Sequence, residues 1–319
     1  MKRRALLAGL ATAPALAGAQ PSLYPRGQVR LLVPYVPGGA TDIQARALAI
    51  RLGAMWGQPV LVENKPGGNT VVATEVVARA VPDGHTLLLA AMPYATNPVL
   101  YDRLPYDMAR DLAPISPISQ VPLALIVAKD SPYQSLAQLL AAARAQPGAL
   151  AYGSPGTGAT PHLAAELLAS RAQVELTHVP YRGGAAVHAD LLAGRLAMVF
   201  DTGAWALIAS GQVRALAVTT GHRLASLPNV PTLAESGFPG LVMTSWHGVV
   251  TTGGTPPALV AWLSAQVAEA LRDPALAARF DQLAAERISM APAAFREFLA
   301  GEQARYGAVI RARGIKPES

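Results

Sequence analysis

The sequence predicts an α/β protein of two lobes, each built on a doubly wound sheet, with a hinge between them. Short aliphatic runs alternate with Ala- and Leu-rich helical patterns, the alternation restarts near residue 122, and the chain after residue 252 is almost purely helical. A strand-poor tail cannot form an α/β domain of its own, so we expect it to pack back on the first unit. The chain would then cross between the lobes twice, which makes a hinge.

The first unit alternates strand and helix in the order typical of a doubly wound sheet. Its predicted elements are strand 29–35, helix 41–56, strand 59–64, helix 70–80 and strand 85–91. In the first helix, Ile43, Ala47, Ile50 and Ala54 recur at helical spacing and share one apolar face.

The second unit repeats this alternation. Its predicted elements are strand 122–129, helix 135–148, strand 150–154, a helix from Thr160, strand 174–179, a helix from Gly184 and strands 196–201 and 213–219. One more extended strand is predicted over 242–252, and helices follow it to the C-terminus. We therefore predict a discontinuous first lobe over 20–122 and 238–319 and a second lobe over 123–237.

The first 19 residues have the pattern of a secretory signal peptide. A basic start, "MKRR", precedes a short apolar run and the small-residue triplet Ala17, Gly18 and Ala19, so we expect cleavage after Ala19 and a periplasmic protein. A membrane anchor is disfavoured because the apolar run is shorter than a span and contains Pro14. Arg3 and Arg4 leave the choice between Sec and twin-arginine export open.

Composition excludes several classes of function. Loss of the leader would remove three cations and lower the formal net charge from +6 to +3, and no basic stripe exists, so we expect no nucleic-acid partner. The chain has no cysteine, which excludes disulfides, thiolate metal sites, thiol catalysis and an acylated N-terminal cysteine.

Two glycine loops lie where a strand meets a helix N-terminus. The first, "VPGGATD", runs from Val36 to Asp42, and Thr41 with Gln44 matches a capping box. The second lies within "AYGSPGTGATPH", where Thr160 is the predicted N-cap and Pro161 the first helical residue.

Such loops favour anions. The first N–H groups of a helix lack internal partners and lie at the positive end of its dipole, and glycines let a ligand approach them closely. One terminus is a weak site and glycine at these turns is common, but two loops from two lobes could close on one carboxylate.

Motifs of catalysis and metal binding are missing from the sequence. There is no G-x-S-x-G, H-E-x-x-H, P-loop lysine or G-x-G-x-x-G, and the six histidines show no metal spacing. We therefore predict no enzyme activity, no metal and no cofactor. An exported enzyme on the same scaffold is the less favoured alternative.

The chain resembles the periplasmic solute-binding receptors of tripartite tricarboxylate transporters, the Bug proteins. The resemblance covers essentially the whole mature chain, in family order. It rests on stretches such as "VRLLVPYVPGGATDIQAR", "GQPVLVENKPGG", "VARAVPDGHTLLLA", "AYGSPGTGATPHLAAELL", "THVPYRGGA", "DLLAGRLAMVFD", "LPNVPTLAESGFPG" and "WHGVVTTGGTPPALV".

The resemblance implies a type 2 periplasmic-binding-protein, or Venus flytrap, fold that captures a small carboxylate between its lobes and delivers it to integral membrane transporter subunits. A sensing subunit for a membrane histidine kinase is a further alternative, and we expect a monomer. The ligand-binding residues that the resemblance implies are Gly38, Gly39, Ala40, Thr41, Asp42, Asn97, Ser154, Gly156, Thr157, Thr160, His162, Tyr181 and Asp201. Arg182 is a candidate partner for a second carboxylate. Pro155 departs from the family pattern and removes one N–H group from the second loop.

Overall fold

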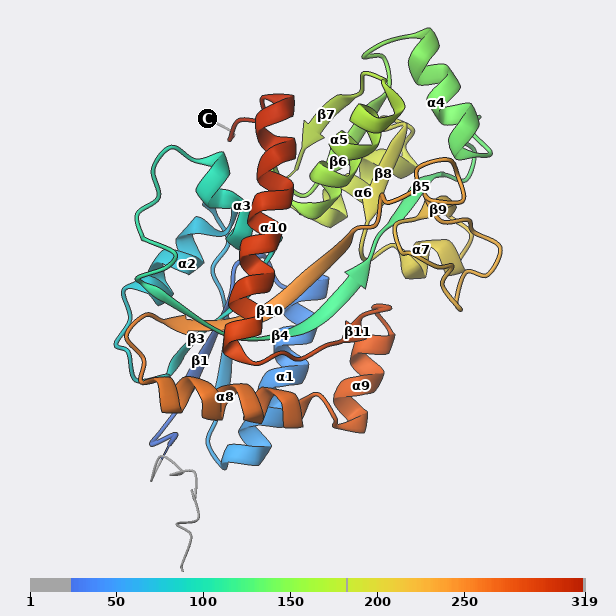
Figure 1. The fold of residues 1–319 in the computed structure, drawn as a ribbon. Coiled ribbons are helices and arrows are strands. Elements are labelled where there is room, and N and C mark those ends of the chain that lie inside the picture. The colour runs from blue at the N-terminus through green and yellow to red at the C-terminus, as the bar shows by residue number, and fades with distance from the viewer. Residues whose placement is uncertain (1–23, 182, 318–319) are drawn as a thin grey trace, which may run out of the picture.

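The structure is a computed structural model that describes residues 24–181 and 183–317. The predicted signal peptide and Arg182 lie outside the described residues. Two sheets with flanking helices form two lobes (Figure 1), which confirms the predicted α/β two-lobed class. Across the described part of the chain, none of the helices is both long and apolar enough for a membrane span.

The large sheet has the order β11-β4-β10-β3-β1-β2. Its strands are β1 (Val29–Val33), β2 (Val60–Asn64), β3 (Thr86–Ala91), β4 (Leu112–Pro122), β10 (Thr244–Thr252) and β11 (Glu286–Arg287). Strands β2, β1 and β3 are parallel, whereas β10 runs antiparallel to both of its neighbours.

The small sheet has the order β7-β6-β8-β5-β9. Its strands are β5 (Ala124–Ala128), β6 (Ala151–Ser154), β7 (Thr177–Pro180), β8 (Met198–Asp201) and β9 (Val213–Val218). Strands β7, β6 and β8 are parallel and β5 is antiparallel to its neighbours. All strands of this sheet lie within the predicted second lobe, and we retain the predicted boundaries as a proposal.

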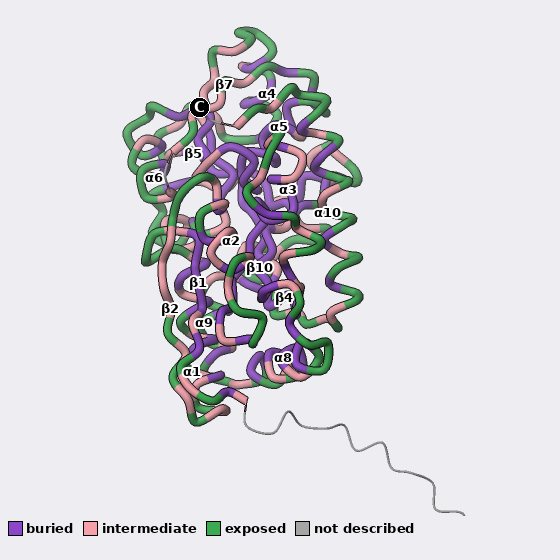
Figure 2. The backbone as a smooth tube through the Cα atoms, turned by 90° about the vertical axis from the view of Figure 1, so that its left-hand side faces the viewer, coloured by how far each residue is buried: buried purple, intermediate pink, exposed green. Residues whose placement is uncertain are grey.

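Helices cover both sheets, and strands β1, β4 and β10 of the large sheet are mostly buried (Figure 2). The helices are α1 (Ala40–Trp56), η1 (Gly68–Thr70), α2 (Val71–Ala78), α3 (Met92–Leu100), α4 (Leu136–Ala145), α5 (Thr160–Ala172), α6 (Gly184–Leu192), α7 (Trp205–Ala209), α8 (Pro257–Ala270), α9 (Pro274–Asp281) and α10 (Pro292–Arg313). The long helix α10 runs beside both lobes (Figure 1), and its Arg313 donates to Glu166 of α5 at 2.6 Å.

Strand β4 is not predicted by the sequence, because its segment contains Pro114, Pro117 and Pro122 and proline cannot donate to a strand ladder. The pairing of β4 with β10 accommodates these prolines through two register shifts, one on each side of the pair Gly248 and Val249. The buried face of α1 is also not the predicted face that contains Ile50. Ile50 is 75% exposed, whereas Leu48 and Leu52 are buried.

The two crossings between the sheets are hydrogen-bonded to each other at Thr219. Its hydroxyl accepts from Leu123 N–H at 3.0 Å and donates to the Met243 carbonyl at 2.6 Å. Its backbone N–H also donates to Leu123 O, and Met243 N–H donates to Thr219 O. Leu123 joins β4 to β5, and Met243 directly precedes β10, so this buried residue ties the two crossings together.

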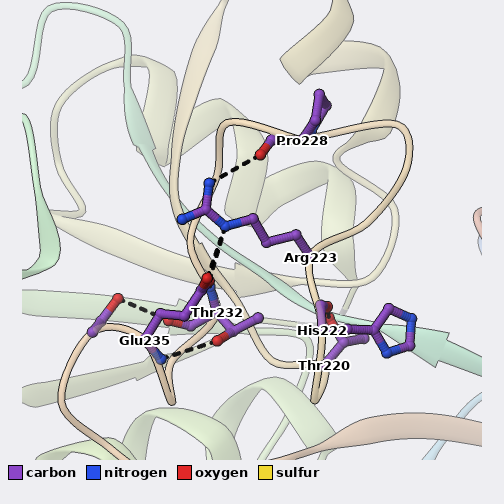
Figure 3. Close-up of polar contacts among 7 residues, drawn as sticks. Thr220, His222, Arg223, Pro228, Thr232 and Glu235 are labelled. Atoms are coloured by element: carbon purple, nitrogen blue, oxygen red, sulfur yellow. Dashed lines mark hydrogen bonds and ion pairs between the residues drawn. The ribbon is translucent and has the colours of Figure 1, made fainter.

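The second crossing contains a long loop whose polar contacts are shown in Figure 3. Arg223 donates to the Glu235 carboxylate at 3.0 Å and to the Pro228 carbonyl at 3.0 Å. Glu235 also accepts from Thr232 N–H at 2.8 Å. These contacts hold the loop between β9 and β10 together.

Replacement of Thr219 by valine tests the link between the crossings. Thr219→Val keeps the shape of the side chain but leaves Leu123 N–H and Met243 O without this partner. We expect the free energy of unfolding to fall by about 1–3 kcal/mol in urea denaturation. Thr220→Val is the control: the Thr220 hydroxyl donates to the nearby His222 carbonyl in an exposed hydrogen bond, so this variant should change the free energy of unfolding by less than about 0.5 kcal/mol. Equal effects of the two variants would contradict the role given to Thr219.

Candidate functional site in the cleft between the lobes

A cavity of about 650 Å³ lies between the lobes. Its lining includes residues that follow β1 and β3 in the large sheet, residues that follow β6, β7 and β8 in the small sheet, and two residues of β10. The volume is typical of sites for small molecules. The carboxyl ends of open α/β sheets are also where such proteins place their ligands.

Six of the predicted ligand-binding residues line this cavity, and they come from both lobes. The first loop contributes most of them, and two come from the second lobe. These six residues are Gly38, Gly39, Ala40, Thr41, Thr160 and Asp201.

The first loop exposes the start of α1 to the cavity. Gly38 has φ +90°, a conformation that favours glycine, and Gly39 is the N-cap of α1. Because Ala40 and Thr41 are the first two helical residues, their N–H groups have no acceptor within the helix. The loop therefore presents backbone donors at the positive end of a 17-residue helix.

The predicted capping box of α1 is wrong. Thr41 and Gln44 do not cap the helix, and Gly39 makes no side-chain cap. Instead, Thr41 Oγ1 lies 3.0 Å from His247 Nε2, and Gln44 Oε1 accepts from Ser119 Oγ at 2.5 Å. His247 is a buried side chain of β10 that requires polar partners, and burial lowers its pKa to about 4. Because the Thr41 side chain contacts His247 instead of capping the helix, the first amides of α1 have no side-chain cap.

In the second loop, too, the predicted threonine does not cap the helix. The N-cap of α5 is Ala159, so Thr160 is the first helical residue and Pro161 the second. The Thr160 hydroxyl donates to Ser245 Oγ of β10 at 3.3 Å, across the two lobes. Since Pro155 and Pro161 have no N–H group, this loop offers fewer donors than the first.

Seven predicted residues lie outside the cavity lining. Several of them hold the second loop in shape. The seven are Asp42, Asn97, Ser154, Gly156, Thr157, His162 and Tyr181.

The side chains of this group contact protein groups. His162 Nδ1 accepts from Gly158 N–H at 2.9 Å, and burial together with His178 lowers the pKa of His162 to about 3, so its ring is neutral. Asn97 is hydrogen-bonded to Asn69 at 2.9 Å, and Tyr181 donates to Asp190 at 2.6 Å. Direct ligand contact by these residues stays a prediction.

Asp42 locks the first loop from outside the cavity. Its carboxylate accepts from Gly38 N–H at 3.0 Å, from Arg46 Nε at 2.9 Å and from Asn64 Nδ2 at 2.9 Å. Burial alone would raise the pKa of Asp42, but the hydrogen bonds from Arg46, Gly38 and Asn64 outweigh it and lower that pKa. The ionised carboxylate thus fixes the backbone that precedes α1.

The sequence predicts a helix from Gly184, but it was not predicted that the start of this helix lines the cavity. Gly183 and Gly184 follow β7 and open α6, and both line the cavity. The signal was available, because "YRGGA" repeats the glycine pair that follows a strand in the first loop. Ser245 and His247 of β10 were also missed, since nothing local marks them.

The described lining residues include neither lysine nor arginine. Asp201 and His188 form a pair in the wall, with His188 Nε2 2.7 Å from Asp201 Oδ2. Among these described lining residues, backbone N–H groups and helix dipoles are therefore the chief source of attraction for an anion. Within 24–181 and 183–317, no three potential metal ligands gather in one place.

Two α/β lobes around one cavity with several helix starts define a two-lobed solute-binding protein. The model of the family described as "Tripartite tricarboxylate transporter family receptor" matches residues 44–315 of the chain. The chain belongs to this family, which confirms the resemblance found in the sequence. The family is one of solute receptors.

Relatives agree with this assignment. Protein BugT of Bordetella pertussis is 35% identical over 311 residues, which cover 96% of this chain and 95% of BugT. The structure of R. palustris Rpa4515 with adipate has a TM-score of 0.87 at 36% identity, covering 92% of this chain and 100% of that one. MatC (Rpa3494) from Rhodopseudomonas palustris with bound malate has a TM-score of 0.82 at 28% identity, covering 90% and 100%.

Substitution of Asp42 tests whether its carboxylate fixes the first loop. Asp42→Ala removes the acceptor for Gly38 N–H, so we expect unfolding free energy to fall by about 1–2 kcal/mol at pH 7, a value kept small because Arg46 is half exposed. Ligand affinity should fall too, because the first loop loosens. Since the folded pKa is lowered, the stabilisation is present above the usual aspartate pKa and is lost as pH falls through the folded value.

Urea denaturation at pH 7 and at pH 3 measures this difference, with the exposed Asp130→Ala as control. A difference between wild type and Asp42→Ala that stays constant down to pH 3 would contradict the assignment. Unchanged ligand affinity would count against the first loop as part of the site.

Proposed function

We propose that the protein is a periplasmic receptor that captures a small carboxylate between its lobes and delivers it to the membrane subunits of a tripartite tricarboxylate-type carrier. The observation that carries the proposal is the meeting of the starts of α1, α5 and α6 in one cavity without lysine or arginine among its described lining residues. The adipate and malate bound by two structural relatives support a carboxylate as the ligand class.

The energetics require donors from more than one loop. A micromolar complex needs about 8 kcal/mol, whereas a charge-assisted hydrogen bond contributes about 1.5–3 kcal/mol before ordering costs. Two or three donors from α1 alone fall short of this once those costs are included. Closure of the second lobe would add the amides of Thr160 and Gly184 and would exclude water from the ligand.

The same geometry supports transport rather than chemistry as the role of the site. Six of its described polar side chains contact one another in pairs: Thr41 with His247, Thr160 with Ser245, and His188 with Asp201. Export through the predicted leader, with cleavage after Ala19, is part of this proposal. Delivery to the carrier rests on the family description.

Removal of one backbone donor tests this function. Ala40 is the first residue of α1, a position that accepts proline, and Gly39 before it is extended with ψ 170°. Ala40→Pro should therefore fold normally but lose one N–H group at the cavity. We expect its affinity for adipate, malate or the best acid of a thermal-shift screen to fall by about tenfold or more in calorimetric titration.

Ala40→Val is the matched control, because it adds the same number of carbon atoms and keeps the N–H group. Its affinity should stay much closer to that of the wild type than the affinity of Ala40→Pro does. If both variants bind equally well, the amide of Ala40 is not a ligand donor. If no carboxylate raises the melting temperature of the wild type, the proposed ligand class is wrong.

A further inference from the structure

His188 is a cavity residue with one ring nitrogen engaged. It lies on α6, and its side chain is 25% exposed. Nε2 lies 2.7 Å from Asp201 Oδ2, and both residues line the cavity. Among the described residues, none forms a hydrogen bond with His188 Nδ1. The ring therefore has one polar atom left for a partner in the cleft.

Asp201 is held so that it can orient this ring. It ends β8, and its other oxygen, Oδ1, accepts the N–H of Gly203 at 2.5 Å. A carboxylate fixed at both oxygens keeps the imidazole from turning, as partners of histidine ligands do at metal sites. The Asp201 carboxylate thereby sets which nitrogen of His188 stays free.

The free nitrogen has opposite chemistry in the two protonation states. In the neutral ring, Nε2 carries the proton and donates to Asp201, so Nδ1 is a hydrogen-bond acceptor that repels an anion. In the charged ring, Nδ1 also carries a proton and donates. The bond to Asp201 raises the pKa of His188 against the opposing effect of burial, which favours the charged ring near neutral pH.

The other titratable groups among the described residues around the cavity do not supply such a cation. Burial lowers the pKa of His247 on β10 to about 4 and raises that of Tyr35 after β1, so both are neutral. On α6 itself, the Asp190 carboxylate is engaged by Tyr181 and Arg195. Apart from Asp201, the described lining residues add no further charged side chain.

We propose that His188 is a specificity-determining residue that selects ligands with a second anionic group. The helix amides would receive one carboxylate, and the Nδ1–H of the charged His188 would donate to the other. The inference rests on the proposed function, since it assigns a role within that same cavity. It predicts a receptor for dicarboxylates rather than for monocarboxylates, and a preference that depends on pH.

The test compares straight-chain dicarboxylates of three to eight carbons with monocarboxylates of equal length by calorimetric titration. The wild-type protein should bind the best dicarboxylate about tenfold or more tightly than the monocarboxylate of equal length. His188→Gln can still donate to Asp201 but carries no charge, so it should lose most of this preference. Its affinity for the monocarboxylate should change by less than about threefold.

His222→Gln is the matched control. His222 is exposed in the loop between β9 and β10, and Figure 3 shows its ring pointing away from the other labelled side chains. This variant should keep the wild-type preference.

A pH series on the wild type provides a second measurement that needs no variant. Above pH 6 both carboxylates of the ligands are ionised, so the preference should fall as pH rises through the pKa of His188 and should stay flat in His188→Gln. A wild type without preference, or one whose preference does not depend on pH or survives in His188→Gln, would overturn the inference while leaving the receptor function intact. Failure of every acid to bind would instead refute the proposed function, and the inference with it.

Discussion

The parallel strands that precede the cavity helices all end at the cleft, and the rest of the site depends on this constraint. Strands β1 and β3 of the large sheet lead into α1 and α3, and strands β6 and β7 of the small sheet lead into α5 and α6. Because a helix that follows such a strand begins near the strand's carboxyl end, its unpaired N–H groups meet in one place. The positive ends of helix dipoles from both lobes then meet in a cavity whose described lining residues include no lysine or arginine.

A shell of buried polar contacts keeps these helix starts in position. His247 holds the side chain of Thr41, Ser245 holds that of Thr160, and both belong to β10. One strand of the large sheet thus contacts helical residues at the starts of α1 and α5, one from each lobe. A loss of either contact would leave a buried polar group unpaired, which is a larger cost than that of an uncapped amide open to a ligand.

Local sequence signals were sufficient for most strands and helices and for the two glycine loops, but not for elements such as β4, α3 or β11. The glycine pair before Ala40 and the glycine-rich turn before Thr160 mark helix starts, because backbone conformation depends on adjacent residues. Contacts between residues far apart in the sequence could not be predicted from it. Thr41 contacts His247, 206 residues further along the chain, instead of forming the predicted capping box, and no local sequence rule predicts such a contact.

The same limit explains the other differences. Strand β4 pairs with β10 despite its prolines because two register shifts leave Ile118 and Ile115 of β4 without a paired residue on β10, and only the folded partner shows this. The buried face of α1 could not be chosen from Ile50 and Ala47, since Leu48 and Leu52 define a second apolar stripe on the same helix. The pair of His188 and Asp201 joins two elements that are close in sequence, but its position in the cavity wall became visible only in the fold.

Calorimetric titration of the protein with one carboxylate and with its primary amide tests the central claim most directly. The two compounds have nearly the same shape, but only the carboxylate accepts with full negative charge from the helix N–H groups. The account predicts that the acid binds at least about tenfold more tightly than the amide, the value of one charge-assisted hydrogen bond. Equal or tighter binding of the amide would contradict an anion site built from helix N-termini.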